Sequence, residues 1–170
     1  HSFNETEHLL VIGDVMGHDS QAKFFAHTFV SYIRGLLLGY NQPPVTTTAN
    51  APSESTNKTT TNKTRTNKTE TKQTFVASDL MAQLSNFVLT DHLAGQTLLT
   101  CQFIYINRDQ IEIVSAGHPA PLLIDKSNKQ ISSLAVKGMA LGLMPGQQYQ
   151  SLTIRLSNQR LLCFTDGLFE

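Results

Sequence analysis

The chain has 170 residues, of which 40% are hydrophobic, and 13 basic and 13 acidic side chains give it a formal net charge of zero. This length and composition predict one globular domain with a substantial core. The even charge argues against a nucleic-acid partner, and no apolar run reaches the roughly 18 residues that a membrane span requires. Two cysteines within apolar stretches favour buried free thiols in a cytoplasmic protein over a disulfide framework. The chain opens on His1 rather than Met, so we expect it to be part of a longer protein.

The first predicted element is a short buried strand at residues 9–12, which leads into an acidic turn. Residues 13–18 read GDVMGH, so the strand delivers Asp14 into a turn that contains two glycines. Glycine lets the backbone adopt unusual dihedral angles or come close to a ligand. Taken alone, such a turn requires no ligand, because Asp accepts hydrogen bonds from its own backbone and Gly supplies a positive φ.

Two helices are expected, one on each side of a low-complexity tract. The first follows the acidic turn, and either Asp19 or Ser20 can cap it. The second begins near residue 78 and ends at Gly95, and the two helices should pack side by side. The apolar face of the first helix, defined by helical spacing, comprises Ala22, Phe25, Ala26, Phe29, Ile33, Leu36, Leu37 and Tyr40.

The tract between the helices, residues 41–74, differs in composition from the rest. Twelve of its 34 residues are Thr, none is aromatic, and a TNKT-containing pentapeptide occurs three times. Such a segment cannot bury enough apolar surface to offset the entropy lost on ordering. We therefore predict a disordered insertion in a single domain that spans residues 1–170. Its Asn-x-Thr triplets match glycosylation acceptors, but an unmodified repeat is favoured in a cytoplasmic protein.

From residue 98 onward the periodicity indicates strands. Residues 98–107 and 111–115 flank a short polar turn and predict a hairpin. Further strands are expected at residues 122–125, 149–156 and 160–165. A strand, two helices and a run of antiparallel strands are typical of the α+β class.

A second acidic turn follows the last predicted strand. Residues 165–170 read TDGLFE, so Asp166 stands after its strand as Asp14 stands after the first. The two strands could therefore lie near each other in one sheet. Two carboxylates held on adjacent strands would suit a hard divalent cation, which prefers oxygen ligands.

Four motifs support a family resemblance. They are GDVMGHD at residues 13–19, SAGHPAPLLI at 115–124, KGMALGLMPG at 137–146 and LLCFTDGLFE at 161–170. In this order they resemble the metal-dependent PPM-type (type 2C) serine/threonine protein phosphatases. The most similar branch is that of stage II sporulation protein E and the bacterial sigma-factor regulatory phosphatases. The resemblance implies a four-layer α/β/β/α sandwich of two antiparallel sheets flanked by helix pairs, with two Mn²⁺ or Mg²⁺ ions at one edge.

The resemblance also implies roles for individual residues. Asp14 would bridge both ions, Val15 would offer its backbone carbonyl to one of them, and Asp166 would bind the second. His18 is expected to shape its turn, with a role as general acid as the alternative, and His118 is expected to be structural. Two neighbouring ions lower the pKa of a bridging water and hold the phosphoryl oxygens for in-line attack, so catalysis would depend on Asp14 and Asp166 and needs no nucleophilic side chain.

The implied function is removal of phosphate from phosphoserine or phosphothreonine on a regulatory protein such as an anti-sigma-factor antagonist. A sensor or receiver domain elsewhere in a longer chain would control it. Family members carry two further acidic ligands, one on a strand before the first turn and one near the C-terminus, and this chain is expected to supply only half of the set. The alternatives are an inactive or truncated module that binds a regulatory partner and a metal hydrolase that acts on a small phosphorylated metabolite.

Overall fold

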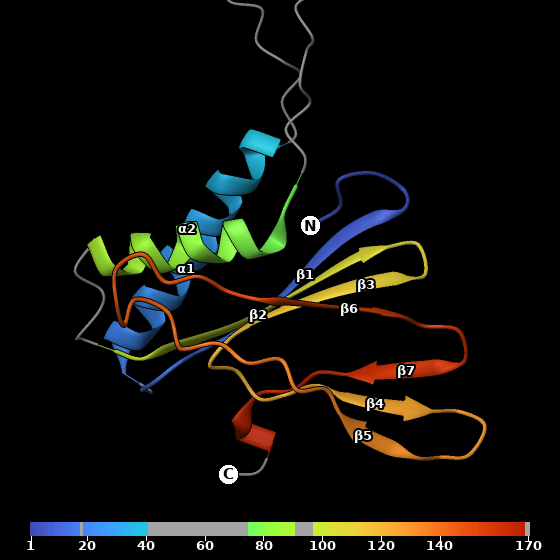
Figure 1. Ribbon diagram of the computed structural model, residues 1–170. Coiled ribbons are helices and arrows are strands. Elements are labelled where there is room, and N and C mark those ends of the chain that lie inside the picture. The colour runs from blue at the N-terminus through green and yellow to red at the C-terminus, as the bar shows by residue number, and fades with distance from the viewer. Residues whose placement is uncertain (18, 41–74, 91–96, 169–170) are drawn as a thin grey trace, which may run out of the picture.

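A computed structural model describes residues 1–17, 19–40, 75–90 and 97–168. It has the α+β class expected from the sequence (Figure 1). In chain order the elements are β1 (Glu7–Val15), α1 (Ser20–Tyr40), α2 (Ala77–Thr90), β2 (Leu99–Asn107), β3 (Gln110–Ala116), β4 (Leu122–Asp125), β5 (Ile131–Ser133), β6 (Ser151–Arg155), β7 (Gln159–Leu162) and the 3₁₀ turn η1 (Asp166–Leu168).

The strands form two antiparallel sheets, which confirms that part of the expected architecture. The first sheet has the order β1-β2-β3-β6, and the second has the order β5-β4-β7. Helices α1 and α2 cover one face of the first sheet, and the second sheet lies on the opposite side (Figure 1). The described residues thus supply three layers of the expected four. The outer face of the second sheet carries Ile131, 62% exposed, and Leu162, 43% exposed, and no described element covers them.

The expectation that the first and last strands share a sheet is wrong. β1 is an edge strand of the first sheet, whereas β7 is an edge strand of the second. The reason lies in residues 117–121, where the chain leaves β3 and crosses to β4. After that crossing β7 pairs with β4, with Leu162 opposite Leu122. The two acidic turns therefore approach each other from stacked sheets and not along one sheet.

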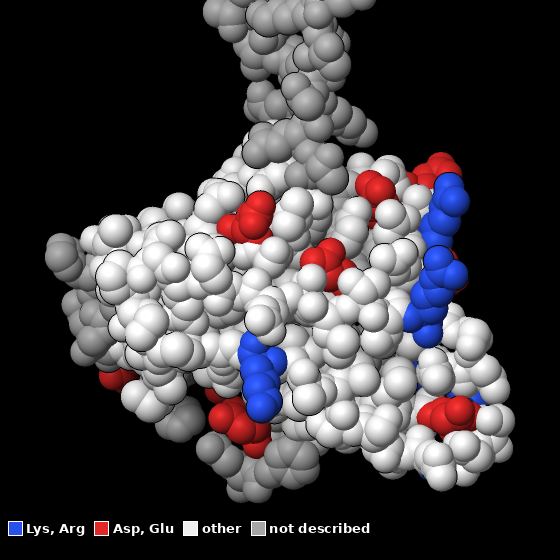
Figure 2. Space-filling view, in the orientation of Figure 1, with Lys and Arg blue, Asp and Glu red and all other residues white. Residues whose placement is uncertain are grey.

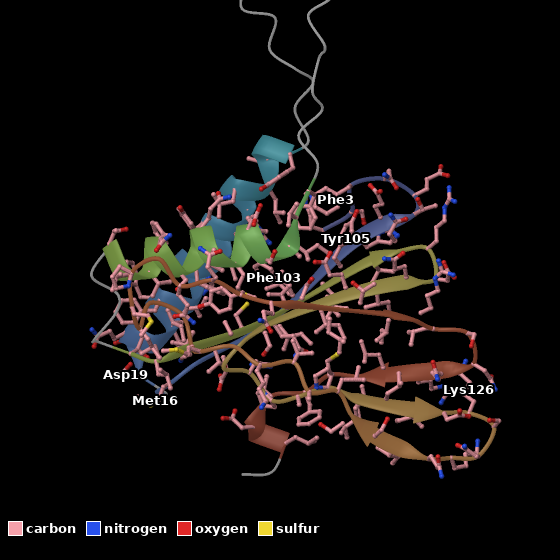
Figure 3. The ribbon with its side chains drawn as sticks, viewed as in Figure 1. Phe3, Met16, Asp19, Phe103, Tyr105 and Lys126 are labelled. Atoms are coloured by element: carbon pink, nitrogen blue, oxygen red, sulfur yellow. The ribbon has the colours of Figure 1, made fainter. Side chains whose placement is uncertain are left out.

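Side chains on β2 alternate between two cores, because successive residues of a strand face opposite sides. Phe103 is fully buried against the helices, where it packs with Phe29 and Leu80. The ring of Tyr105 also lies on the helix side (Figure 3). Ile104 faces the second sheet in a smaller cluster. Each such aliphatic or aromatic side chain contributes about 1.5–3 kcal/mol by burial, so both layers are bound to β2.

One of the two residues proposed as the N-terminal cap of α1 has that role in the structure. The Asp19 carboxylate accepts a hydrogen bond from the backbone N–H of Ala22 at 2.8 Å, so Asp19 is the cap and Ser20 is the first helical residue. The predicted face is buried at Ala22, Phe25, Phe29, Ile33 and Leu37. The predicted insertion at 41–74, and the predicted end of the second helix at Gly95, lie outside the described residues.

The later strands are shorter than the sequence pattern indicates. The strand expected at 149–156 spans Ser151–Arg155, and the one expected at 160–165 spans Gln159–Leu162. β5 was not expected, because its three residues are all exposed and give no alternation. Residues 134–150 follow an irregular path that is tied to β2 and α2, for example by the N–H of Leu141, which donates to the carbonyl of Leu99 at 3.0 Å, and the N–H of Gly142, which donates to the Ser85 hydroxyl at 3.1 Å.

The charge distribution on the surface and the state of the two cysteines can be compared with what the composition predicts. On the described part of the face in Figure 2, acidic side chains lie among the Lys and Arg side chains. Both cysteines are free thiols, and burial raises the pKa of Cys101 and of Cys163 above its ordinary value. No described helix combines the length and the apolar character that crossing a membrane demands.

Candidate metal centre

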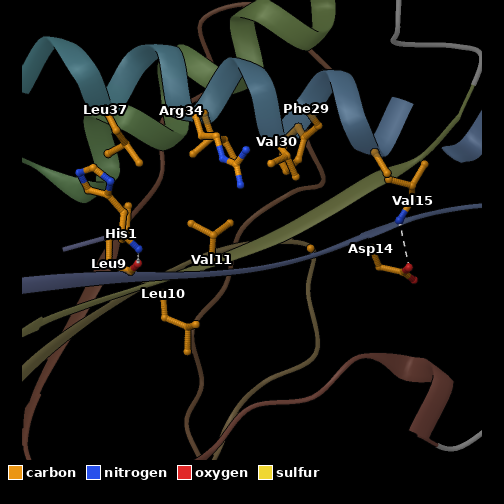
Figure 4. Close-up of a pocket in the computed structure, with 13 residues that line it drawn as sticks. His1, Leu9, Leu10, Val11, Asp14, Val15, Phe29, Val30, Arg34 and Leu37 are labelled. Atoms are coloured by element: carbon orange, nitrogen blue, oxygen red, sulfur yellow. Dashed lines mark hydrogen bonds between the residues drawn. The ribbon is translucent and has the colours of Figure 1, made fainter. Parts of the chain in front are cut away.

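Asp14 stands near the end of β1, where the ladder to β2 still holds the backbone. It lies opposite Thr100 in the register, and the ladder extends to Met16, whose N–H donates to the carbonyl of Leu98 at 3.0 Å. Asp14 Oδ1 accepts from the N–H of Val15 at 3.0 Å (Figure 4). Gly17 then turns the chain with φ of 113°, a left-handed angle that favours glycine.

Asp166 opens the turn η1, close after β7. Its Oδ1 accepts from the N–H of Gly167 at 3.1 Å, and the N–H of Leu168 donates to the carbonyl of Thr165 at 3.2 Å. The carboxylate is exposed. In each of the two acidic turns one carboxylate oxygen accepts from the N–H of the next residue, Val15 or Gly167, which leaves carboxylate lone pairs available in both.

His118 lies between the two turns. It is only 6% exposed, and its Nδ1 is 3.0 Å from the hydroxyl of Thr100. Burial lowers the pKa of His118, while Asp14, the backbone carbonyl of Phe164 and Asp166 act in the opposite direction. Both predicted ligands therefore act electrostatically on one imidazole. The structure brings Asp14 and Asp166 to the same edge of the molecule, one from each sheet.

A cleft of about 580 Å³ lies next to this edge, between β1 and α1. Leu9 and Val11 line it from the strand, and Phe29 and Arg34 line it from the helix (Figure 4). Alternation along β1 places the Asp14 carboxylate on the opposite face of the sheet from these strand side chains. The cleft is mainly apolar, and Asp14 borders it while its carboxylate points to the other face of the sheet (Figure 4).

Two glycines of the second and third motifs hold the crossing loop in place. The N–H of Gly117 donates to the carbonyl of Gly138 at 2.8 Å, and Gly117 has φ of 68°. A Cβ at Gly138 would lie 1.8 Å from the carbonyl oxygen of Ser115. Glycine is required at 138 because two backbones touch there. These motifs therefore build the support for His118.

The chemistry of the donors fits a hard divalent cation in type. Mg²⁺ and Mn²⁺ prefer oxygen, and Asp14 and Asp166 offer carboxylates while Val15 offers a backbone carbonyl at a strand end. Among the described residues, no group of three or more His, Cys, Asp and Glu side chains is placed to hold a metal. His18 lies outside the described residues, so neither of its proposed roles is tested. The described part of the site thus supplies two carboxylates.

Comparison with solved structures defines the class of fold. The RsbU and RsbW domains of Rv1364c from Mycobacterium tuberculosis align over 99% of this chain and 38% of theirs, with 17% identity and a TM-score of 0.68. The PP2C phosphatase domain of SpoIIE from Bacillus subtilis, solved with a fragment of its regulatory domain, aligns over 99% and 40%, with 11% identity and a TM-score of 0.62. RsbX in complex with magnesium aligns over 97% and 63%, with 15% identity and a TM-score of 0.58. The fold is that of the PP2C-type phosphatases.

The family follows from the sequence itself. The family model described as stage II sporulation protein E (SpoIIE) matches residues 4–170, and the chain therefore belongs to this family. The predicted resemblance is thus confirmed. A search of curated proteins gives no match to this chain. The chain spans less than half the length of the first two solved chains above.

Sequence reasoning missed two groups at this edge. Thr100 contacts His118 from the start of β2, in an ordinary strand pattern, and only the register that sets it opposite Asp14 shows its importance. The Phe164 carbonyl is a backbone group, so its role does not depend on the residue type at that position. No local signal in the sequence identifies either one.

Proposed function

We propose that this chain forms the core of a metal-dependent serine/threonine protein phosphatase. The observation that carries the proposal is the convergence of Asp14 and Asp166, from two different sheets, on one edge around His118. Membership of the SpoIIE family supports the same reading. In this proposal Asp14 would hold both of two Mn²⁺ or Mg²⁺ ions, the carbonyl of Val15 would hold one of them, and Asp166 would hold the other. When bound, the ions would supply an activated water and charge stabilisation for phosphoryl transfer.

The chain's own residues would orient the reaction. The Val15 N–H holds one Asp14 oxygen at 3.0 Å and the Gly167 N–H holds one Asp166 oxygen at 3.1 Å, which restrains the orientation of each carboxylate. Because the Asp166 turn is exposed, a phosphorylated side chain on the surface of another protein could reach it. The proposed substrate is a phosphoserine or phosphothreonine protein resembling an anti-sigma-factor antagonist, in the cytoplasm. Control by a sensor or receiver domain in a longer chain is part of the same proposal, and nucleic acid and membrane are not expected partners.

A second candidate is a phosphatase-like module that binds a regulatory partner without turnover. It is favoured by one observation, that the described residues bring together two candidate carboxylates and no larger cluster. Two carboxylates hold fewer positions around a pair of ions than an active centre requires.

Hydrolysis of p-nitrophenyl phosphate separates these functions. The protein that contains residues 1–170 should hydrolyse it with Mn²⁺ and stop when the metal is chelated. Asp14→Asn should reduce the rate to background, because the bridging carboxylate loses its charge. Asp109→Asn, in the β2–β3 turn, is the matched control and should keep the parent rate. Partner binding without metal-dependent hydrolysis would favour the non-enzymatic module, and activity on the small ester but not on phosphopeptides would favour a metabolite hydrolase.

A further inference from the structure

The loop at residues 117–121, which carries His118 between the sheets, is held at several points. Besides the bond between Gly117 and Gly138, the hydroxyl of Ser115 donates to the carbonyl of His118 at 3.3 Å. The side-chain amide of Gln102 lies 3.5 Å from the carbonyl of Pro119. The backbone of His118 is therefore anchored to β2 and β3, so the position of its ring is set by the first sheet.

The ring contacts a group beside each candidate ligand. On one side is the hydroxyl of Thr100, the residue opposite Asp14 in the register. On the other side the backbone carbonyl of Phe164, two residues before Asp166, lies against the imidazole. A carbonyl can only accept, so a neutral imidazole would carry its proton on Nε2 and accept from the Thr100 hydroxyl at Nδ1. Nε2 is buried without a hydrogen-bond partner among the described residues, so the Phe164 carbonyl acts on the ring as a nearby dipole.

His118 is not placed to bind an ion directly. Nε2 is shielded from solvent, and Nδ1 is taken by the Thr100 hydroxyl. An effect of this residue on the metal centre must therefore pass through the groups that it contacts. One of those groups, Thr100, lies opposite Asp14 in the β1–β2 register, and the other, the carbonyl of Phe164, lies two residues before Asp166. The two turns come from sheets with no shared strand pairing.

We propose that His118 is a positioning residue that ties the Asp14 turn of the first sheet to the Asp166 turn of the second. The inference rests on the proposed function for its catalytic meaning, while the link itself is a property of the metal-free fold. Groups that orient metal ligands in this way usually raise the affinity for the metal, and their removal lowers that affinity roughly 10–100-fold.

The test uses paired variants at Thr100, since its side chain is on an otherwise regular strand. Thr100→Val keeps the shape and removes the hydroxyl, whereas Thr100→Ser keeps the hydroxyl. His118→Asn keeps an amide near the position of Nδ1 and removes the group that faces Phe164. Two measurements are made on the parent and on each variant: Mn²⁺ affinity by calorimetric titration, and hydrogen exchange of backbone amides without metal. We expect Thr100→Val and His118→Asn to weaken Mn²⁺ binding about tenfold or more, and Thr100→Ser to stay close to the parent.

Hydrogen exchange separates positioning from a purely structural role. Faster exchange confined to residues 13–16 and 164–168 in Thr100→Val supports the link. Exchange that rises equally across both sheets, or parent-like exchange and Mn²⁺ affinity in both Thr100→Val and His118→Asn, overturns it. A parent that binds no Mn²⁺ would refute the proposed metal centre alone, because local exchange in the metal-free variants still decides whether the two turns are tied.

Discussion

Gly138 and Gly35 illustrate opposite reasons for a glycine. At Gly138 an added Cβ would lie 1.8 Å from the carbonyl oxygen of Ser115, so the backbones of the loop and of β3 must separate. At Gly35, within α1, an added Cβ meets nothing within 4 Å. The first glycine holds the support of the candidate site together, whereas the second only gives the unfolded chain extra conformational freedom.

We therefore expect alanine to have opposite effects at the two positions. Gly138→Ala should lower the free energy of unfolding by about 1–3 kcal/mol or more through overpacking. Gly35→Ala should raise it by about 0.5–1 kcal/mol, because alanine is the better helix former. Urea unfolding of the parent and both variants measures the two changes. If both variants unfold at the same urea concentration, the close approach at Gly138 is not present in the protein.

At the scale of elements, α1 provides a matched pair of phenylalanines. Phe29 is 6% exposed and packs in the core between α1 and the first sheet, whereas Phe24, five positions earlier, is 64% exposed. Phe29→Ala should cost about 3–5 kcal/mol, as expected for a buried aromatic side chain. Phe24→Ala is the control, and a surface change of this kind should stay within about 0.5 kcal/mol. Similar melting temperatures for the two variants would show that the buried face of α1 is assigned wrongly.

The helices were predictable because their evidence is local. The spacing of Phe25, Phe29 and Ile33 fixes a buried face within a few turns, and the structure buries all three. Sheet membership was less predictable, because β1 pairs with β2 across both helices and the intervening tract. Asp14 and Asp166 come from different sheets, so the prediction that they lie on adjacent strands was wrong. Their roles as ligands remain predictions.

At the scale of the whole molecule, the first sheet ties the layers together. Its β2 strand contributes Phe103 to the helix-side core and Ile104 to the core between the sheets. Thr100 of the same strand joins the crossing loop through His118. The candidate centre therefore depends on how the two sheets are stacked, which no single motif of the sequence specifies. This is why the motifs predicted the class of fold and could not predict the contacts between the two turns.

The ends of the two described segments that flank residues 41–74 lie next to each other. The rings of Tyr40, at the end of α1, and Phe75, just before α2, are 5.2 Å apart in an edge-to-face arrangement. Phe75 also packs with Phe3 and Tyr105, at 4.8 and 4.9 Å. These contacts among described residues hold the two ends next to each other. A much shorter connection could therefore join them.

We expect deletion of Thr46–Thr71 to leave the fold intact. The deletion keeps residues 41–45 and 72–74, eight of the original 34, as the connection between Tyr40 and Phe75. The tract's composition predicts that it adds little to the core, and each halving of a flexible loop lowers its closure cost by about 0.6 kcal/mol. The melting temperature should thus stay the same or rise slightly, by an amount that corresponds to about 1 kcal/mol. Phe75→Ala in the intact chain is the comparison. It removes the ring contacts with Tyr40, Phe3 and Tyr105 and should lower the melting temperature although the tract is still present. A drop of several degrees on deletion would mean that residues 46–71 pack on the domain, contrary to their composition.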